Sequence, residues 1–205
     1  VVEGWDARAV AEGTATLLYG PEKTQVRSND FMYLPVGTEH GLTNAADIPC
    51  RLLVMGFKIP SGTNVPPPAK LMLANSDDVP LQVLGQHGPT TQFRLLMGPT
   101  RSRRDKLAAT RQVTSLFMMD FAAGGTNIPH NHNAEEEIYF VLRGRGDMVA
   151  GAGPDGKETR YPCQKGDAFY FVPGTLIGFY SGAKEGQEHD LIVAVRSNYP
   201  AADSK

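Results

Sequence analysis

Short apolar runs separated by glycine and proline are the feature that most constrains the fold of this chain. The 205 residues include 22 glycines and 15 prolines, together about 18% of the sequence against a usual value of about 12%. No segment keeps an apolar period of 3.6 residues, and β-branched and aromatic residues gather in short segments instead. We therefore expect an all-β protein with strands at 92–97, 113–121, 137–142, 168–172 and 191–195 and one short helix candidate at 104–110.

The charge and the cysteine content exclude several classes of protein. Lysine and arginine total 20 and aspartate and glutamate total 22, so no basic excess indicates binding to nucleic acid or to an anionic membrane. No apolar run approaches the length of a membrane span. Cys50 and Cys163 lack the spacing of a metal or redox motif, so we expect reduced thiols in a cytoplasmic protein, with a single disulfide as the alternative.

An internal repeat predicts a duplicated domain. Residues 29–40 align with residues 166–177, with Asp, Tyr, Gly and Thr in register, and residues 1–4 resemble residues 141–144. The alternative is that strand-and-turn patterns recur by chance in β proteins. Between the copies, the proline-rich segment 59–68 is typical of an extended connector. The predicted organisation is a partial first domain at 1–60, a linker with connecting strands at 61–90, and a second domain at 91–205.

The strongest chemical feature is the pair His130 and His132, followed by Glu137. On an extended segment, residues two apart point to the same face, so both imidazoles can converge and a short turn can return the carboxylate beside them. Two imidazoles and one carboxylate suit a single divalent transition metal, which we expect to be Mn, Fe, Zn or Ni. Glu136 is the alternative to Glu137 as the third ligand. The alternative for the histidine pair is an ordinary polar turn.

The spacing of Gly124, His130, His132, Glu137 and Gly144 resembles the first signature motif of the cupin superfamily. The resemblance implies two cupin barrels, each a double-stranded β-helix or jelly roll, in one chain, which is the arrangement of a bicupin. It also implies that the metal lies in the second barrel on the two histidines and the glutamate. The first barrel would be incomplete, because its own first motif would precede Val1.

The second cupin signature is found twice, with different departures. Residues 29–44 resemble it closely and keep His40 at the position of the family's fourth metal ligand. Residues 166–181 resemble it less well, and Ile177 stands at that position. An isoleucine cannot bind a metal, so the resemblance implies a three-ligand site in the second barrel. We expect His40 to be structural or to line a pocket.

Other candidate residues could have either a functional role or a purely structural one. Strand alternation places Tyr139 on the face of Glu137, which makes it a candidate catalytic proton donor or a plain filler of the barrel. Tyr170 and Phe179 are candidates for the wall of a site or for simple packing. We expect His87 and His189 to be exposed to solvent, with His189 as a remote candidate for the missing ligand.

Two functions are compatible with these residues. The first is a metal-dependent enzyme that acts on a small polar metabolite through the site in the second barrel, with dioxygenase, hydrolase and isomerase chemistry left open. The alternative is a non-catalytic bicupin that binds a small molecule or is structural. The chain bears a partial likeness to bicupins of the ureidoglycine aminohydrolase kind. We expect a homo-oligomer that binds neither nucleic acid nor membranes.

Overall fold

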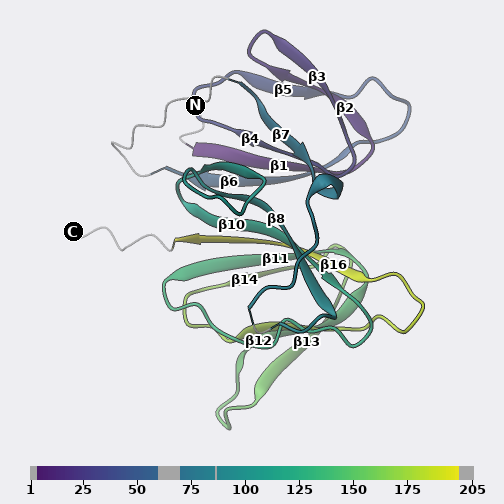
Figure 1. The fold of residues 1–205 in the computed structure, drawn as a ribbon, viewed down its shortest axis with the longest axis vertical. Coiled ribbons are helices and arrows are strands. Elements are labelled where there is room, and N and C mark those ends of the chain that lie inside the picture. The colour runs from purple at the N-terminus through teal and green to yellow at the C-terminus, as the bar shows by residue number, and fades with distance from the viewer. Residues whose placement is uncertain (1–3, 60–69, 86, 199–205) are drawn as a thin grey trace, which may run out of the picture. The chain divides into compact units, whose positions relative to one another are not determined.

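The computed structural model describes residues 4–59, 70–85 and 87–198 and divides into two units, Val1–Val79 and Pro80–Lys205 (Figure 1). The described residues are almost entirely strands, turns and loops, and a single 3-10 turn, η1 (Ser76–Asp78), is the one helical element among them. The expected all-β fold is confirmed. None of the helices in these ranges is long and apolar enough to cross a membrane.

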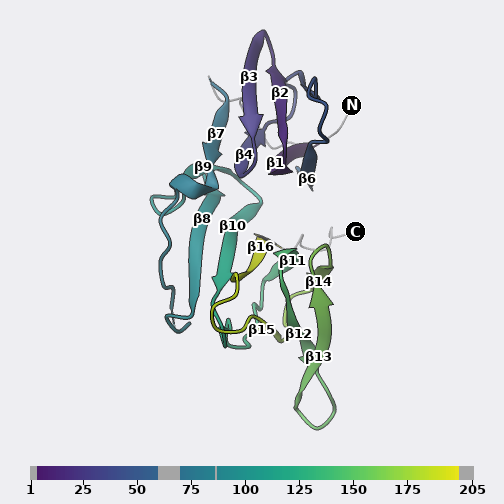
Figure 2. The ribbon, with the colours of Figure 1, turned by 90° about the vertical axis from the view of Figure 1, so that its right-hand side faces the viewer.

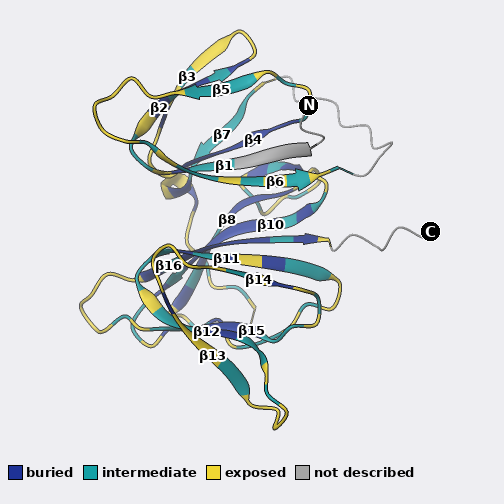
Figure 3. Cartoon of the chain, turned by 180° about the vertical axis from the view of Figure 1, so that it is seen from behind, coloured by how far each residue is buried: buried dark blue, intermediate teal, exposed yellow. Residues whose placement is uncertain are grey.

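The first unit contains two antiparallel sheets. One has the strand order β6-β1-β4-β7 and the other the order β3-β2-β5. The bounds of its described strands are β1 Gly4–Glu12, β2 Thr14–Tyr19, β3 Glu22–Arg27, β4 Asp30–Leu34, β5 His40–Thr43, β6 Arg51–Lys58 and β7 Met72–Asn75. Buried side chains from both sheets, among them Val10, Leu17 and Met32, form one core. Figure 3 shows the outer strand β3 largely exposed.

The second unit repeats this plan with a larger first sheet, in the order β14-β11-β16-β10-β8-β9, and a second sheet in the order β13-β12-β15. Its described strands are β8 Thr91–Pro99, β9 Leu107–Thr110, β10 Val113–Phe121, β11 Glu135–Arg143, β12 Arg145–Ala152, β13 Glu158–Gln164, β14 Ala168–Phe171, β15 Ile177–Ser181 and β16 Asp190–Asn198. Figure 2 shows β12 and β13 as a hairpin. Phe121, Val141, Met148 and Phe179 belong to its core, and each such fully buried side chain contributes about 1.5–3 kcal/mol.

The two units share one strand topology. β1 pairs with β4 and β6, just as β11 pairs with β14 and β16, and β2 lies between β3 and β5 as β12 lies between β13 and β15. The register shift between Val10 and Glu12 in β1 has its counterpart between Val141 and Arg143 in β11. Strands β1–β6 therefore correspond, one by one, to strands β11–β16.

The backbone at the turns supports the same correspondence and corrects one of the sequence alignments. Asn29 and Gly166 both adopt positive φ, at 72° and 97°, a conformation that favours glycine and that asparagine tolerates better than most residues. Gly13 follows β1 as Gly144 follows β11, with φ of 83° and 87°. The counterpart of Gly144 is therefore Gly13 and not Gly4, and residues 1–3 of the earlier alignment lie outside the described residues.

Two further sequence predictions differ from the structure. The helix expected at 104–110 is wrong, because Leu107–Thr110 forms β9 and pairs in parallel with β8. Burial of Leu107 and Ala109 in this pairing outweighs the helix propensity of the alanines. The proline-rich connector lies mostly outside the described residues. The region expected to link the domains also includes β7, which pairs with β4 and belongs to the first unit.

Candidate metal centre

Strand alternation in β11 turns Glu137 into the second unit. Glu137 and Tyr139 are each 1% exposed, whereas Ile138 between them is 38% exposed. The antiparallel pairing of β11 with β16 places Arg196 directly opposite Glu137. The Glu137 side chain is therefore enclosed by its own sheet, with a guanidinium group as its neighbour across the strands.

His130 and His132 lie on the extended segment that precedes β11. The backbone of His130 exchanges two hydrogen bonds with Ile177 on β15, at N–O distances of 2.9 and 2.8 Å, which fixes this segment against the second sheet. His130 Nδ1 lies 2.9 Å from the carbonyl oxygen of Ile128, so in the neutral ring Nδ1–H donates there and Nε2 keeps its lone pair. That Nε2 lies 3.1 Å from Nε2 of His132, with the two rings nearly perpendicular.

The carboxylate of Glu137 meets this histidine pair. Glu137 Oε2 lies 3.5 Å from His132 Nε2, and Oε1 lies 3.5 Å from Arg196 Nε. Both oxygens are buried, and neither accepts a hydrogen bond among the described residues. Burial raises the pKa of Glu137 to about 7, against the opposing influence of Arg196. Burial also lowers the pKa of His132 to about 4, with Arg196 and His130 adding to the effect, so its ring is neutral at pH 7.

These donors match a divalent transition metal in their chemistry. Neutral imidazole nitrogens and a carboxylate are the ligands that such ions prefer, and a buried carboxylate without a hydrogen bond is costly until something positive or a donor reaches it. Among the described residues, however, no group of three His, Cys, Asp or Glu side chains is arranged to hold a metal ion. The residues therefore fit a metal in the kind of donor atoms that they offer.

The residues of this site lie in a segment that matches a known protein family. Residues 117–185, which include both histidines and Glu137, match the family described as the cupin domain. A germin-like protein of subfamily 2 from Arabidopsis thaliana is 31% identical over 106 residues. The chain therefore carries a cupin domain at residues 117–185. The match to the germin-like protein covers 51% of this chain and 47% of that protein, so the chain spans about half the length of that curated relative.

Solved structures share the two-unit fold of this cupin. The oxalate decarboxylase of Lactobacillus farciminis, solved as a formate complex, superposes with a TM-score of 0.69 and 13% identity over 96% of this chain and 71% of its own. Hazelnut vicilin superposes with a TM-score of 0.63 and 12% identity over 97% of this chain and 72% of its own. At these identities the likeness concerns the fold alone.

The neighbouring acidic residues of the cupin site have other partners. Glu136 accepts hydrogen bonds from Ser197 Oγ at 2.8 Å and from Tyr170 at 2.7 Å, which turns it away from the histidines and favours Glu137 as the third ligand. Glu135 accepts a hydrogen bond from Thr114 and lies 3.8 Å from both His132 Nδ1 and Arg196 Nη1. Glu135 therefore lies beside the site, next to His132 and Arg196.

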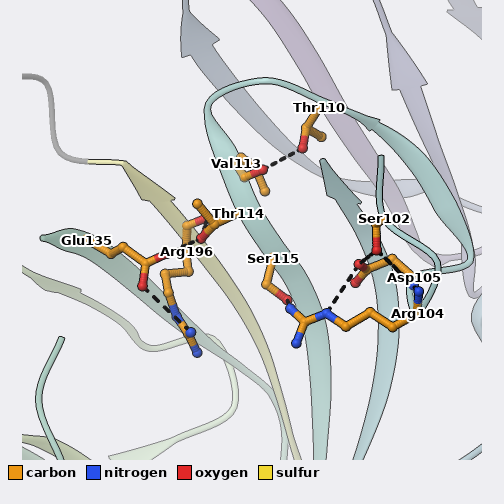
Figure 4. A network of polar contacts seen from close by, with 9 residues as sticks. All are labelled: Ser102, Arg104, Asp105, Thr110, Val113, Thr114, Ser115, Glu135 and Arg196. Carbon is orange, nitrogen blue, oxygen red and sulfur yellow. Dashed lines mark hydrogen bonds and ion pairs between the residues drawn. The ribbon is translucent and has the colours of Figure 1, made fainter. Parts of the chain in front are cut away.

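Three residues beside the site were missed in the sequence. His87, Arg104 and Arg196 line a cavity of about 230 Å³ together with His130 and His132. His87 is half-buried, with its ring centroid 5.5 Å from that of His130, so the expectation that it is exposed is wrong. The pairing of β11 with β16 brings Arg196 to Glu137, and the loop before β9 brings Arg104 to Ser115 (Figure 4). Neither pairing has a local sequence signal.

The remaining candidates lie elsewhere in the cupin fold. Tyr139 is in the core, its hydroxyl accepts a hydrogen bond from Asn127 Nδ2 at 3.0 Å, and it is not among the residues that line the cavity. Its role as a catalytic proton donor stays a prediction. Phe179 packs in the core and Tyr170 is 55% exposed. His189 is exposed, as expected, and its Nδ1 lies 2.5 Å from Asp120 Oδ1.

Proposed function

We propose that this cupin is a metal-dependent enzyme that acts on a small polar metabolite, with His130, His132 and Glu137 as the metal ligands. The observation that carries the proposal is the buried carboxylate of Glu137, which accepts no hydrogen bond from the described residues and lies 3.5 Å from an imidazole nitrogen. A purely structural barrel gains nothing from enclosing an acid and two imidazoles in this way.

The chain's own residues prepare the site for such an ion. The Ile128 carbonyl orients the His130 ring and holds a proton on Nδ1, which leaves Nε2 as the ligand atom. The low pKa of His132 keeps its ring neutral, and the β11 backbone fixes Glu137 beside it. A divalent ion bound there supplies Lewis-acid chemistry that polarises a carbonyl group or activates water. Because Ile177 offers no ligand atom, the three-ligand set leaves positions for substrate or water.

The second candidate is a non-catalytic cupin that binds a small molecule without turnover. Two observations favour it. Ile177 occupies the position of the family's fourth ligand, and Arg196 already places a positive charge 3.5 Å from Glu137. In this case the guanidinium would be the positively charged neighbour of the Glu137 side chain without a metal. The small-molecule ligand, the homo-oligomeric state and the cytoplasmic location remain part of the proposal under either candidate.

Metal content per chain tests the proposal. The wild type, His132→Ala and the matched control His40→Ala are purified without chelator or affinity-tag nickel, then analysed by inductively coupled plasma mass spectrometry before and after incubation with Mn(II), Fe(II) or Zn(II). We expect about one equivalent in the wild type and in His40→Ala, and a loss of nearly all of it in His132→Ala. No metal in the wild type after incubation would contradict the enzyme and leave the non-catalytic cupin.

A further inference from the structure

The cavity beside the candidate metal centre presents donors and no acids. Its volume of about 230 Å³ is below the ~300–1,000 Å³ of pockets for drug-sized ligands, so it suits a ligand of a few heavy atoms. The described residues that line it include two arginines and three histidines, and none of them is an aspartate or a glutamate. Phe93 and Phe117 supply apolar wall.

Arg196 is held at this cavity with hydrogen-bonding capacity to spare. Its guanidinium lies over the ring of Phe117, 5.6 Å from the centroid. Its Nε is buried and makes no hydrogen bond among the described residues, because Glu137 at 3.5 Å is beyond the ordinary range for an N–H···O bond. A guanidinium carries five N–H donors in a rigid fork that matches a carboxylate in geometry. Arg196 is therefore placed to receive an anionic group.

A second residue of the cavity lining also has a buried polar atom. His87 Nδ1 is buried and has no hydrogen-bond partner among the described residues. The His87 ring lies against Phe93, at a centroid distance of 5.2 Å. Burial lowers the pKa of His87, so the ring is neutral at pH 7 and either tautomer leaves a polar nitrogen that needs a partner. Two residues of one cavity lining thus each have a buried polar atom without a hydrogen-bond partner among the described residues, which favours a polar occupant.

Arg104 reaches the same space from the other side of β10. Its Nη2 lies 3.3 Å from Ser115 Oγ, and its Nε lies 3.4 Å from Asp105 (Figure 4). Asp105, Glu135 and Glu137 offset part of the charge of the two arginines, but none of the three lines the cavity. A divalent ion at the candidate metal centre would add two positive charges beside the occupant. An anion thus meets donors on the wall and a net positive charge once the metal is bound.

We propose that this cavity binds a small carboxylate ligand, with the guanidinium of Arg196 as its principal anchor and Arg104 and His87 as neighbouring polar contacts. The proposal rests on the proposed function, because the ligand would lie next to the His130, His132 and Glu137 donors and could reach a metal held there. It adds the chemical class of the ligand, which the metal ligands alone do not define.

The test uses malonate as the carboxylate and malonamide as its neutral counterpart of similar size. Binding of each to the full chain is measured by isothermal titration calorimetry, first without metal and then after loading with Mn(II) and removal of the excess. The variants are Arg196→Gln, Arg196→Lys and the matched control Arg143→Gln, whose side chain pairs at the surface with Glu188 and does not line the cavity. Thermal unfolding and metal content are measured on every sample.

We expect malonate to bind to the wild type and to Arg143→Gln with the same affinity, at least tenfold more weakly to Arg196→Gln, and with an intermediate loss to Arg196→Lys, which keeps the charge but not the fork. Malonamide should bind at least tenfold more weakly than malonate. His87→Phe should weaken malonate binding severalfold and provides a second variant should Arg196→Gln unfold.

Failure of this proposal and failure of the proposed function give different results. A wild type that loads metal but binds malonamide as well as malonate, or an Arg196→Gln variant that binds malonate with unchanged affinity, would overturn the carboxylate site and leave the metal centre intact. A wild type that loads no metal yet binds malonate through Arg196 would support the carboxylate site and contradict the metal-dependent enzyme.

Discussion

The two units of this cupin have the same strands but different chemistry at three matched positions. By register, Arg8, His40 and Gly56 of the first unit correspond to Tyr139, Ile177 and Arg196 of the second. The first unit has a histidine, His40, where the second unit has Ile177. The counterpart of Glu137 is Asp6, whereas the counterparts of His130 and His132 fall outside the described residues.

The difference shows that the neighbouring side chain determines which interactions a histidine ring nitrogen makes. In the first unit, Arg8 Nη2 lies 3.2 Å from His40 Nε2, and His40 Nδ1 lies 2.8 Å from the carbonyl oxygen of Thr38. An arginine only donates, so His40 Nε2 accepts from it and Nδ1 donates to the carbonyl. In the second unit, the two Nε2 atoms of His130 and His132 face one another beside a buried acid. The same fold thus engages an imidazole lone pair with an arginine in one unit and brings two imidazole nitrogens together in the other.

The cysteines give the largest expected contrast between the units. Burial raises the pKa of Cys163 to about 11, from a reference value of 9.0, which lowers its thiolate fraction at pH 8 about a hundredfold. Cys50 in the first unit is partly exposed. We therefore expect a thiol reagent to modify Cys50 rapidly and Cys163 about a hundredfold more slowly than an exposed thiol. The rate for Cys163 should rise with pH until about 11.

Single variants separate the two thiols. Cys50→Ser should leave only the slow phase, and Cys163→Ser only the fast one, when the reaction is followed by absorbance under native conditions. Equal rates for both cysteines in the folded chain would show that the core of the second unit opens readily to solvent and would remove this contrast between the units.

Restoring the missing ligand is the second way to challenge the comparison. Ile177→His gives the second unit the residue that the first has at His40, so we expect its metal affinity to rise on the order of thirtyfold, or about 2 kcal/mol. Ile177 is 2% exposed, so the same change should destabilise the metal-free chain. Metal titration and thermal unfolding measure the two effects. Ile177→Leu is the control, and an unchanged affinity in Ile177→His would show that position 177 does not face the metal.

The sequence alone predicted the features that depend on residues close together along the chain. The bounds of β10 were predicted to the residue, and alternation placed Glu137 and Tyr139 on the inner face of β11 because period and spacing are local properties. Arg196 could not be placed, because its role arises from pairing between β11 and β16. The repeat was misaligned at its first motif because the β12–β13 hairpin turn, after Ala152, is longer than the β2–β3 turn, after Tyr19. The offset between the copies therefore changes along the chain.

The third prediction gives the first unit an apolar residue at position 40, as the second unit has at Ile177. His40→Leu removes the acceptor for Arg8 and leaves part of a half-buried guanidinium without this partner, so we expect a loss of about 1.5 kcal/mol in the free energy of unfolding. Metal content should not change. Chemical denaturation measures the first quantity and mass spectrometry the second. A loss of metal in His40→Leu would show that the first unit takes part in metal binding.

Tyr139→Phe is the smallest and most discriminating change. The hydroxyl of Tyr139 accepts a hydrogen bond from Asn127 in the core, burial raises the pKa of Tyr139 well above 10, and the residue does not line the cavity. A structural role predicts a loss of about 1 kcal/mol in stability with unchanged metal content and unchanged malonate binding. A catalytic proton donor would show the same loss of stability and unchanged binding, together with a large fall in turnover once a substrate is known. Asn127→Ala is the matched control, because it removes the other side of the same hydrogen bond and should lower stability while leaving the Tyr139 hydroxyl in place.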